Sequence, residues 1–111
     1  MLLSERKCSV CTKHTASLSE DESARLISQL QAGWRIEAGK LCRSYRFPNF
    51  ISAMQLANRI AEAAEVEQHH PDLLVKWGEL RVEIWTHAIA ALSENDFILA
   101  AKIDQCAGRS T

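Results

Sequence analysis

One short stretch, Glu65-Val66-Glu67-Gln68-His69-His70-Pro71, separates a helical pattern from a strand pattern and so decides the fold. Before it, residues 50–68 carry apolar side chains at spacings of three and four, which predicts an amphipathic helix. Pro71 cannot continue a helix, and it pushes the residue before it towards an extended conformation. After it, alternating residues over 73–77 and 80–87 flank a Gly-Glu pair, which predicts a β-hairpin. Two adjacent histidines are therefore held at a bend between helix and strand.

The rest of the chain repeats this arrangement. Residues 19–22 have the S-x-x-E pattern of a capping box and predict a helix that Gly33 stops. Strand patterns over 34–37 and 41–47 predict a first hairpin, and a second capping-box pattern over 93–96 predicts a last helix. The order α-β-β-α-β-β-α favours an α+β fold, in which a four-stranded antiparallel sheet has three helices packed on one face.

The chain has 111 residues, 47% of them apolar, which suits a single core. We expect one domain over residues 19–111 and, before it, a polar arm over residues 1–18 that is flexible or docks late. The formal net charge of -1, with interspersed signs, argues against a nucleic-acid partner. Because no apolar run approaches the roughly 18 residues of a membrane span and no signal peptide is evident, we expect a cytoplasmic protein without a membrane partner.

The arm carries Cys8-Ser9-Val10-Cys11 and His14, a C-x-x-C-x-x-H pattern typical of soft-metal binding or thiol exchange. A structural zinc site needs four ligands, and no second pair of cysteines or histidines lies nearby in the sequence. We therefore expect no metal or other cofactor. In the cytosol the four cysteines, which include Cys42 and Cys106, should remain thiols.

Three of the four histidines, His69, His70 and His87, lie within nineteen residues. Histidine has an unperturbed pKa of about 6.5, so such a cluster suits acid/base chemistry near neutrality. Glu65 and His69 are four positions apart, a helical spacing that predicts a carboxylate orienting this imidazole. The same residues have an equally good structural explanation: the histidine pair caps a helix end, His87 is a surface residue, and Asp96 caps the last helix.

Two further interpretations remain. A three-histidine metal site with Glu65 is less favoured, because adjacent histidines rarely direct both rings to one ion and no H-x-x-x-H pair is present. Trp34, Trp77 and Trp85 suit stacking on a flat ring, although a tryptophan in a strand more often fills a core. Residue spacing alone thus predicts an acid/base pocket and no particular substrate.

The spacing of these residues resembles the motif of the pterin-4a-carbinolamine dehydratase family, and the resemblance extends more loosely over residues 19–107. The cysteine-containing arm is similar to that of bacterial members. Two positions depart from the pattern: Gln68, directly before the histidine pair, and Leu73, which stands where members often have a tryptophan. The motif consists of an acid, His-His-Pro, an aromatic residue, a third histidine and an aspartate, here Glu65, His69-His70-Pro71, Trp77, His87 and Asp96.

The resemblance implies an enzyme that removes water from a 4a-hydroxytetrahydropterin, giving the quinonoid dihydropterin. Such an enzyme recycles the tetrahydrobiopterin-type cofactor spent by an aromatic amino acid hydroxylase. By resemblance, His69 and His87 are the acid/base residues, and His70 binds the pterin and takes part in catalysis. The resemblance also gives supporting roles to Glu65 and Asp96 and substrate contacts to Trp77 and Pro71.

The same resemblance leaves a second function open. Animal members of the family also serve as dimerisation cofactors of a homeodomain transcription factor, so the fold can act as a non-catalytic interaction module. The presence of all three histidines favours the enzyme. The resemblance further implies a homodimer or homotetramer, and an open four-stranded sheet has edges that need covering.

Overall fold

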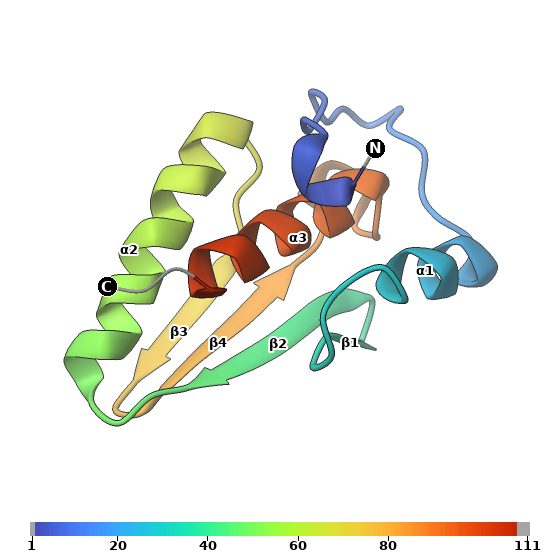
Figure 1. The fold of residues 1–111 in the computed structure, drawn as a ribbon. Coiled ribbons are helices and arrows are strands. Elements are labelled where there is room, and N and C mark those ends of the chain that lie inside the picture. Colours follow the sequence, from blue (N-terminus) through green and yellow to red (C-terminus); the bar gives the residue numbers. More distant parts are fainter. Residues whose placement is uncertain (1, 109–111) are drawn as a thin grey trace.

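The computed structural model describes residues 2–108, and it confirms the predicted α+β fold and its element order (Figure 1). Two short 3-10 turns, η1 and η2, add to this order near the arm and after the last strand. The elements are η1 (Leu3–Glu5), α1 (Glu20–Ile27), β1 (Arg35–Glu37), β2 (Lys40–Arg46), α2 (Phe50–Glu67), β3 (Asp72–Lys76), β4 (Glu79–Ile84), η2 (His87–Ile89) and α3 (Glu94–Gly108).

The four strands form one antiparallel sheet in the order β1-β2-β4-β3. The two hairpins meet at β2 and β4, where Leu41 pairs with Ile84 and Tyr45 pairs with Leu80. Helices α2 and α3 lie over one face of the sheet, and α1 lies near the β1 end (Figure 1). The edge strands are β1 and β3, so the start of β3 brings the histidine pair to one end of the sheet.

Local sequence signals set the helix starts. The Ser19 hydroxyl accepts from the Glu22 amide while the Glu22 carboxylate accepts from the Ser19 amide, which is the predicted capping box. Helix α1 ends at Ile27, earlier than the predicted stop at Gly33, and Ser28 donates to the Arg25 carbonyl at 2.6 Å. A serine hydroxyl that binds the backbone in this way competes with the continuing helix.

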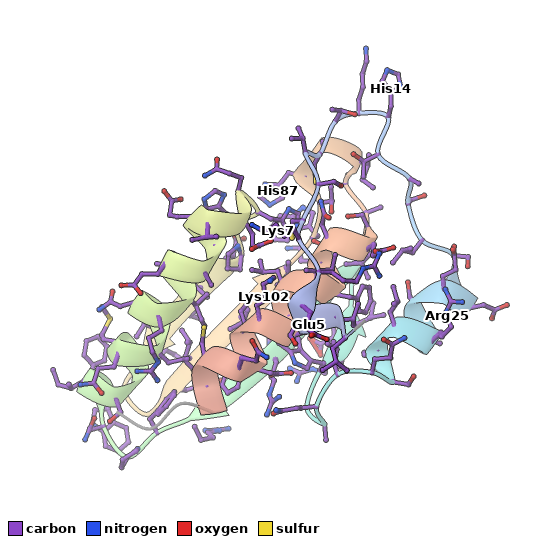
Figure 2. The ribbon with its side chains drawn as sticks, turned by 45° about the horizontal axis from the view of Figure 1, so that its top comes forward. Glu5, Lys7, His14, Arg25, His87 and Lys102 are labelled. Atoms are coloured by element: carbon purple, nitrogen blue, oxygen red, sulfur yellow. The ribbon has the colours of Figure 1, made fainter. Side chains whose placement is uncertain are left out.

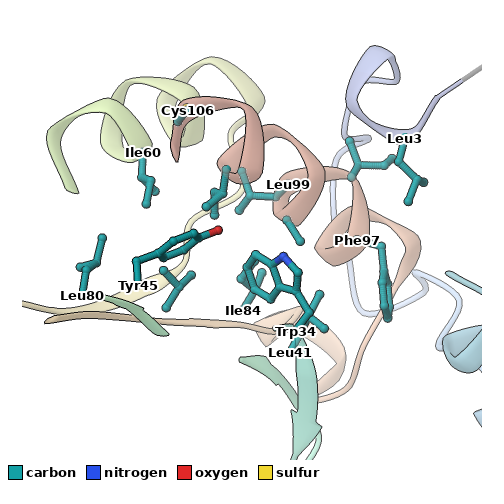
Figure 3. Close-up of a cluster of buried hydrophobic side chains, with 14 of the residues drawn as sticks. Leu3, Trp34, Leu41, Tyr45, Ile60, Leu80, Ile84, Phe97, Leu99 and Cys106 are labelled. Atoms are coloured by element: carbon teal, nitrogen blue, oxygen red, sulfur yellow. The ribbon is translucent and has the colours of Figure 1, made fainter. Parts of the chain in front are cut away.

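The core lies between the inner face of the sheet and the two helices α2 and α3 (Figure 3). Leu41, Leu80 and Ile84 from the sheet are fully buried against Phe97 and Leu99 of α3. One buried acid interrupts this apolar layer: Asp104 of α3 accepts hydrogen bonds from three side chains. These are the Trp34 indole at 2.9 and 3.0 Å, the Tyr45 hydroxyl at 2.6 Å and the Arg43 guanidinium at 2.8 Å.

The arm is docked in this structure, which is one of the two arrangements that the sequence left open. Leu3 is buried in the core, and η1 packs on α3. Lys102 donates to the Ser4 carbonyl at 2.9 Å, and the Cys8 amide donates to Glu67 at 2.8 Å. Figure 2 shows the arm crossing α3, with His14 at its outer end. The predicted boundary between arm and domain remains a prediction.

Candidate functional site

The two adjacent histidines follow α2 and point in different directions. Gln68 adopts a left-handed conformation, with φ 54° and ψ 37°, which ends the helix at Glu67. His69 then turns into the protein and is 7% exposed, whereas His70 is exposed. The bend predicted from Pro71 is therefore present, but it begins at Gln68, three residues before the proline.

His69 forms its strongest contact with a buried carboxylate. Its Nε2 lies 2.6 Å from Oδ1 of Asp96, a residue with no exposed surface. The other oxygen, Oδ2, accepts from the Thr86 hydroxyl at 2.9 Å and from the Ser93 amide at 2.8 Å. Because Oδ2 already accepts two hydrogen bonds, Asp96 acts as an acceptor, and we infer that His69 donates to Oδ1 through a proton on Nε2. Asp96 therefore caps α3, as the structural explanation predicted, and also orients a histidine.

The second ring nitrogen of His69 faces the arm. Nδ1 lies 3.7 Å from Sγ of Cys11, which is half-buried. The other cysteine of the motif, Cys8, does not bind the ring; its thiol donates to the Asn95 carbonyl at 3.5 Å. Burial and then the Glu67 carboxylate raise the pKa of Cys8 to about 12, so it stays protonated at neutral pH.

The predicted pairing of Glu65 with His69 is wrong. Glu65 Oε2 lies 2.5 Å from Nε2 of His70, and both side chains are exposed. The helical spacing of four does not apply, because the left-handed Gln68 turns the chain before His69 is reached. Each of the two histidines thus has its own carboxylate, and the carboxylate of His69 comes from α3.

His87 joins the pair from the other side. It opens the 3-10 turn η2, beyond the end of β4 at Ile84, since Thr86 leaves the strand to form a bridge with Ala91. Its ring contacts that of Trp85 in a tilted arrangement, with centroids 4.2 Å apart and planes inclined at 51°. The sequence placed His87 at the end of the strand itself; the turn instead directs it towards the histidine pair.

A cavity of about 180 Å³ brings the three histidines together. This is less than the roughly 300 Å³ of most ligand pockets, so the cavity is small for a binding site. Among residues 2–108, no group of three His, Cys, Asp or Glu side chains could hold a metal ion. The cavity is lined by Cys11, Gln68, His69, His70, Trp85, Thr86, His87 and Ala88.

Four residues of the motif lie outside this lining. Glu65 and Asp96 instead contact the histidines His70 and His69, and Trp77 and Pro71 make neither contact. Trp77 is 74% exposed at the turn between β3 and β4, about 17 Å of strand away from the histidine pair. Pro71 follows His70 directly but does not line the cavity. The aromatic residue that does is Trp85, and its alternation with His87 along the strand pattern was the signal for it in the sequence.

The site lies in a part of the chain that matches known proteins. The family model for pterin 4 alpha carbinolamine dehydratase matches residues 16–106. A Rickettsia canadensis (strain McKiel) protein named for this activity is 50% identical over 104 residues, which cover 93% of this chain and 95% of that protein. The Arabidopsis thaliana protein pterin-4-alpha-carbinolamine dehydratase 2, mitochondrial, is 44% identical over 93% of this chain and 58% of its own length.

Solved structures agree with the sequence matches. The crystal structure of a transcriptional coactivator/pterin dehydratase from Brucella melitensis superposes with a TM-score of 0.78 and 27% identity, covering 84% of this chain and 100% of that one. A pterin dehydratase-like RuBisCO assembly factor of the alpha-carboxysome shares the fold, with a TM-score of 0.60 and 18% identity over 72% of this chain and 95% of that one. The chain therefore belongs to the pterin 4 alpha carbinolamine dehydratase family.

Proposed function

We propose that this protein is a hydro-lyase that removes water from a 4a-hydroxytetrahydropterin and gives the quinonoid dihydropterin. The observation that carries the proposal is the convergence of His69, His70 and His87 on one cavity. Family membership supports it independently. A chain in which these histidines only capped a helix would not need to bring His87 from a separate turn to the same place.

The reaction needs two proton transfers. The C4a–O bond breaks as the leaving hydroxyl takes a proton, while the N5–H proton is removed and its electron pair forms the C4a=N5 double bond. One imidazolium and one neutral imidazole supply these steps near neutral pH. We assign the two steps to His69 and His87, which both line the cavity: His69 follows α2, and His87 opens η2.

The carboxylates support these roles in different ways. Asp96 holds Nε2 of His69 and keeps the ring proton on that nitrogen, so Nδ1 is the nitrogen available on the cavity side. Glu65 orients His70, which we assign to binding the pterin and assisting catalysis. Trp85 provides an aromatic wall beside His87, and we assign to it the substrate contact that the resemblance had given to Trp77.

The test is a coupled assay. An aromatic amino acid hydroxylase generates the carbinolamine, and its decay is followed by ultraviolet absorbance with and without this protein. The wild type should accelerate the decay, whereas His70→Ala and His87→Ala should lose most of the acceleration while keeping the far-ultraviolet circular dichroism of the wild type. His14→Ala, at the exposed end of the arm, is the matched control and should stay active. A folded wild type without effect on the decay would refute the proposal.

We further propose that the protein works as a homodimer or homotetramer beside an aromatic amino acid hydroxylase in the cytoplasm. The edge strands β1 and β3 end the sheet, and exposed strand edges favour pairing with another chain. In residues 2–108, the helices are too short or too polar to cross a membrane. Sedimentation velocity at micromolar concentration tests the oligomer, and a single monomeric species would refute it.

A further inference from the structure

The arm places a thiol against a histidine of the proposed site. Of the described arm residues 2–18, Cys11 alone lines the histidine cavity. Its Sγ lies 3.7 Å from Nδ1 of His69, although 58 residues separate the two in the chain. The proposed proton transfers assign no role to this thiol, so the contact needs its own explanation.

The thiol is held in place by an amide from α3. Asn95 accepts from the Ser9 amide through Oδ1 at 3.0 Å and donates to the Ser9 carbonyl through Nδ2 at 2.8 Å. These two bonds fix which way the side-chain amide points. In this orientation Nδ2 also donates to Sγ of Cys11 at 3.0 Å. The sulfur therefore accepts from Asn95, and its own S–H remains available as a donor.

That donor has two acceptors within reach. The nearer is Nδ1 of His69 at 3.7 Å, and the Ser9 carbonyl follows at 3.9 Å. Because Nε2 of His69 donates to Asp96, Nδ1 carries the lone pair and can accept from the thiol. The imidazole of His69 is thus contacted at both nitrogens, by the Asp96 carboxylate at Nε2 and by the Cys11 thiol at Nδ1.

We propose that Cys11 is a positioning residue for the dehydration, acting through His69. The inference rests on the proposed function. Asp96 alone holds the ring at one atom and leaves it free to tilt, whereas a second contact at Nδ1 fixes its plane. A thiol is a weak donor, so the hydroxyl or N–H of a bound pterin can displace it when proton transfer begins. The docked arm therefore presents His69 in the orientation and tautomer that the reaction needs.

The first part of the test is kinetic. Cys11→Ala should lower kcat about 3- to 10-fold, the range expected for losing one modest hydrogen bond, and leave KM within about twofold. Cys11→Ser retains a donor and should recover most of the loss. Cys8→Ser is the matched control, because Cys8 belongs to the same motif but binds the Asn95 carbonyl instead of His69. It should behave as the wild type.

The second part reads the ring directly. Two-bond ¹H–¹⁵N spectra of the ligand-free protein should show His69 protonated at Nε2, and Cys11→Ala should move the Nδ1 resonance while Cys8→Ser leaves it in place. Wild-type kcat together with an unmoved Nδ1 resonance in Cys11→Ala would overturn the positioning role of Cys11 and leave the proposed function standing. An inactive wild type would overturn the proposed function and, with it, the positioning role.

Discussion

Replacing Asp104 should lower the free energy of unfolding more than any change at the protein surface. This buried residue joins three parts of the chain, because Trp34 precedes β1, Arg43 and Tyr45 belong to β2, and Asp104 itself lies in α3. Burial and then Asp104 raise the pKa of Tyr45, so its hydroxyl stays protonated and donates to the carboxylate. Removing the carboxylate leaves all three donors without their acceptor.

The size of the effect follows from these contacts. A buried donor without an acceptor costs about 1–3 kcal/mol, and breaking a buried ion pair costs about 3–5 kcal/mol. The Arg43 side chain is 18% exposed, so water can replace part of the interaction that this guanidinium loses. Since such costs are not additive within one cluster, we expect Asp104→Ala to lower the free energy of unfolding by about 4 kcal/mol. Asp104→Asn keeps the shape and one oxygen, and should cost about 2 kcal/mol.

Urea unfolding followed by tryptophan fluorescence and circular dichroism measures both variants. Glu62→Ala, an exposed position on α2, is the control and should change the free energy by less than about 0.5 kcal/mol. Because Asp104 lies outside the histidine cavity, the folded fraction of each variant should keep wild-type turnover. A loss below about 1 kcal/mol for Asp104→Ala would refute the reasoning, since it would mean that the three donors find other partners.

Three further changes test the site and the arm. Asp96→Asn should lower turnover about 100-fold in a folded protein, because its amide can present a donor to Nε2 of His69 and favour the wrong tautomer; wild-type kcat would contradict this. Leu3→Ala should lower the free energy of unfolding by about 2–4 kcal/mol in urea, and a loss under about 0.5 kcal/mol would indicate an undocked arm. With the pKa of Cys8 raised from 9.0 to about 12, the folded state holds this proton more tightly than the unfolded state. The contribution of Cys8 to the free energy of unfolding should therefore stay constant below about pH 9 and fall above it. Between pH 8 and pH 10, urea unfolding should show a smaller fall in this free energy for Cys8→Ser than for the wild type.

The fold followed from the sequence where short-range signals dominate. The capping box at Ser19 and the cap at Asn49, which accepts from the Ser52 amide at 2.8 Å, start their helices where expected. Gly39 and Gly78, with φ of 75° and 77°, occupy the hairpin turns, a conformation that glycine adopts without strain. Each of these signals acts within a few residues, so the sequence alone is enough to locate it.

The sequence predicted the site only in part, because it identified the histidines but not the side chains that contact them. Histidine chemistry and spacing predicted that His69, His70 and His87 act together, and the cavity brings them together. The helical rule for Glu65 failed at Gln68, where a left-handed residue other than glycine ends the helix without a sequence signal strong enough to predict it.

The contacts that decide the chemistry span long distances in the chain. His69 is 27 residues from Asp96 and 58 from Cys11, and no helical or strand periodicity relates such positions. They meet because α3 packs against α2 with its first turn beside His69, and because the arm docks on α3 in turn. Asn95 and Asp96 are adjacent in this first turn, yet one holds the thiol and the other holds the ring. A shift of α3 by one residue would therefore release both nitrogens of His69 at once, so the docking of this helix controls the geometry of the site.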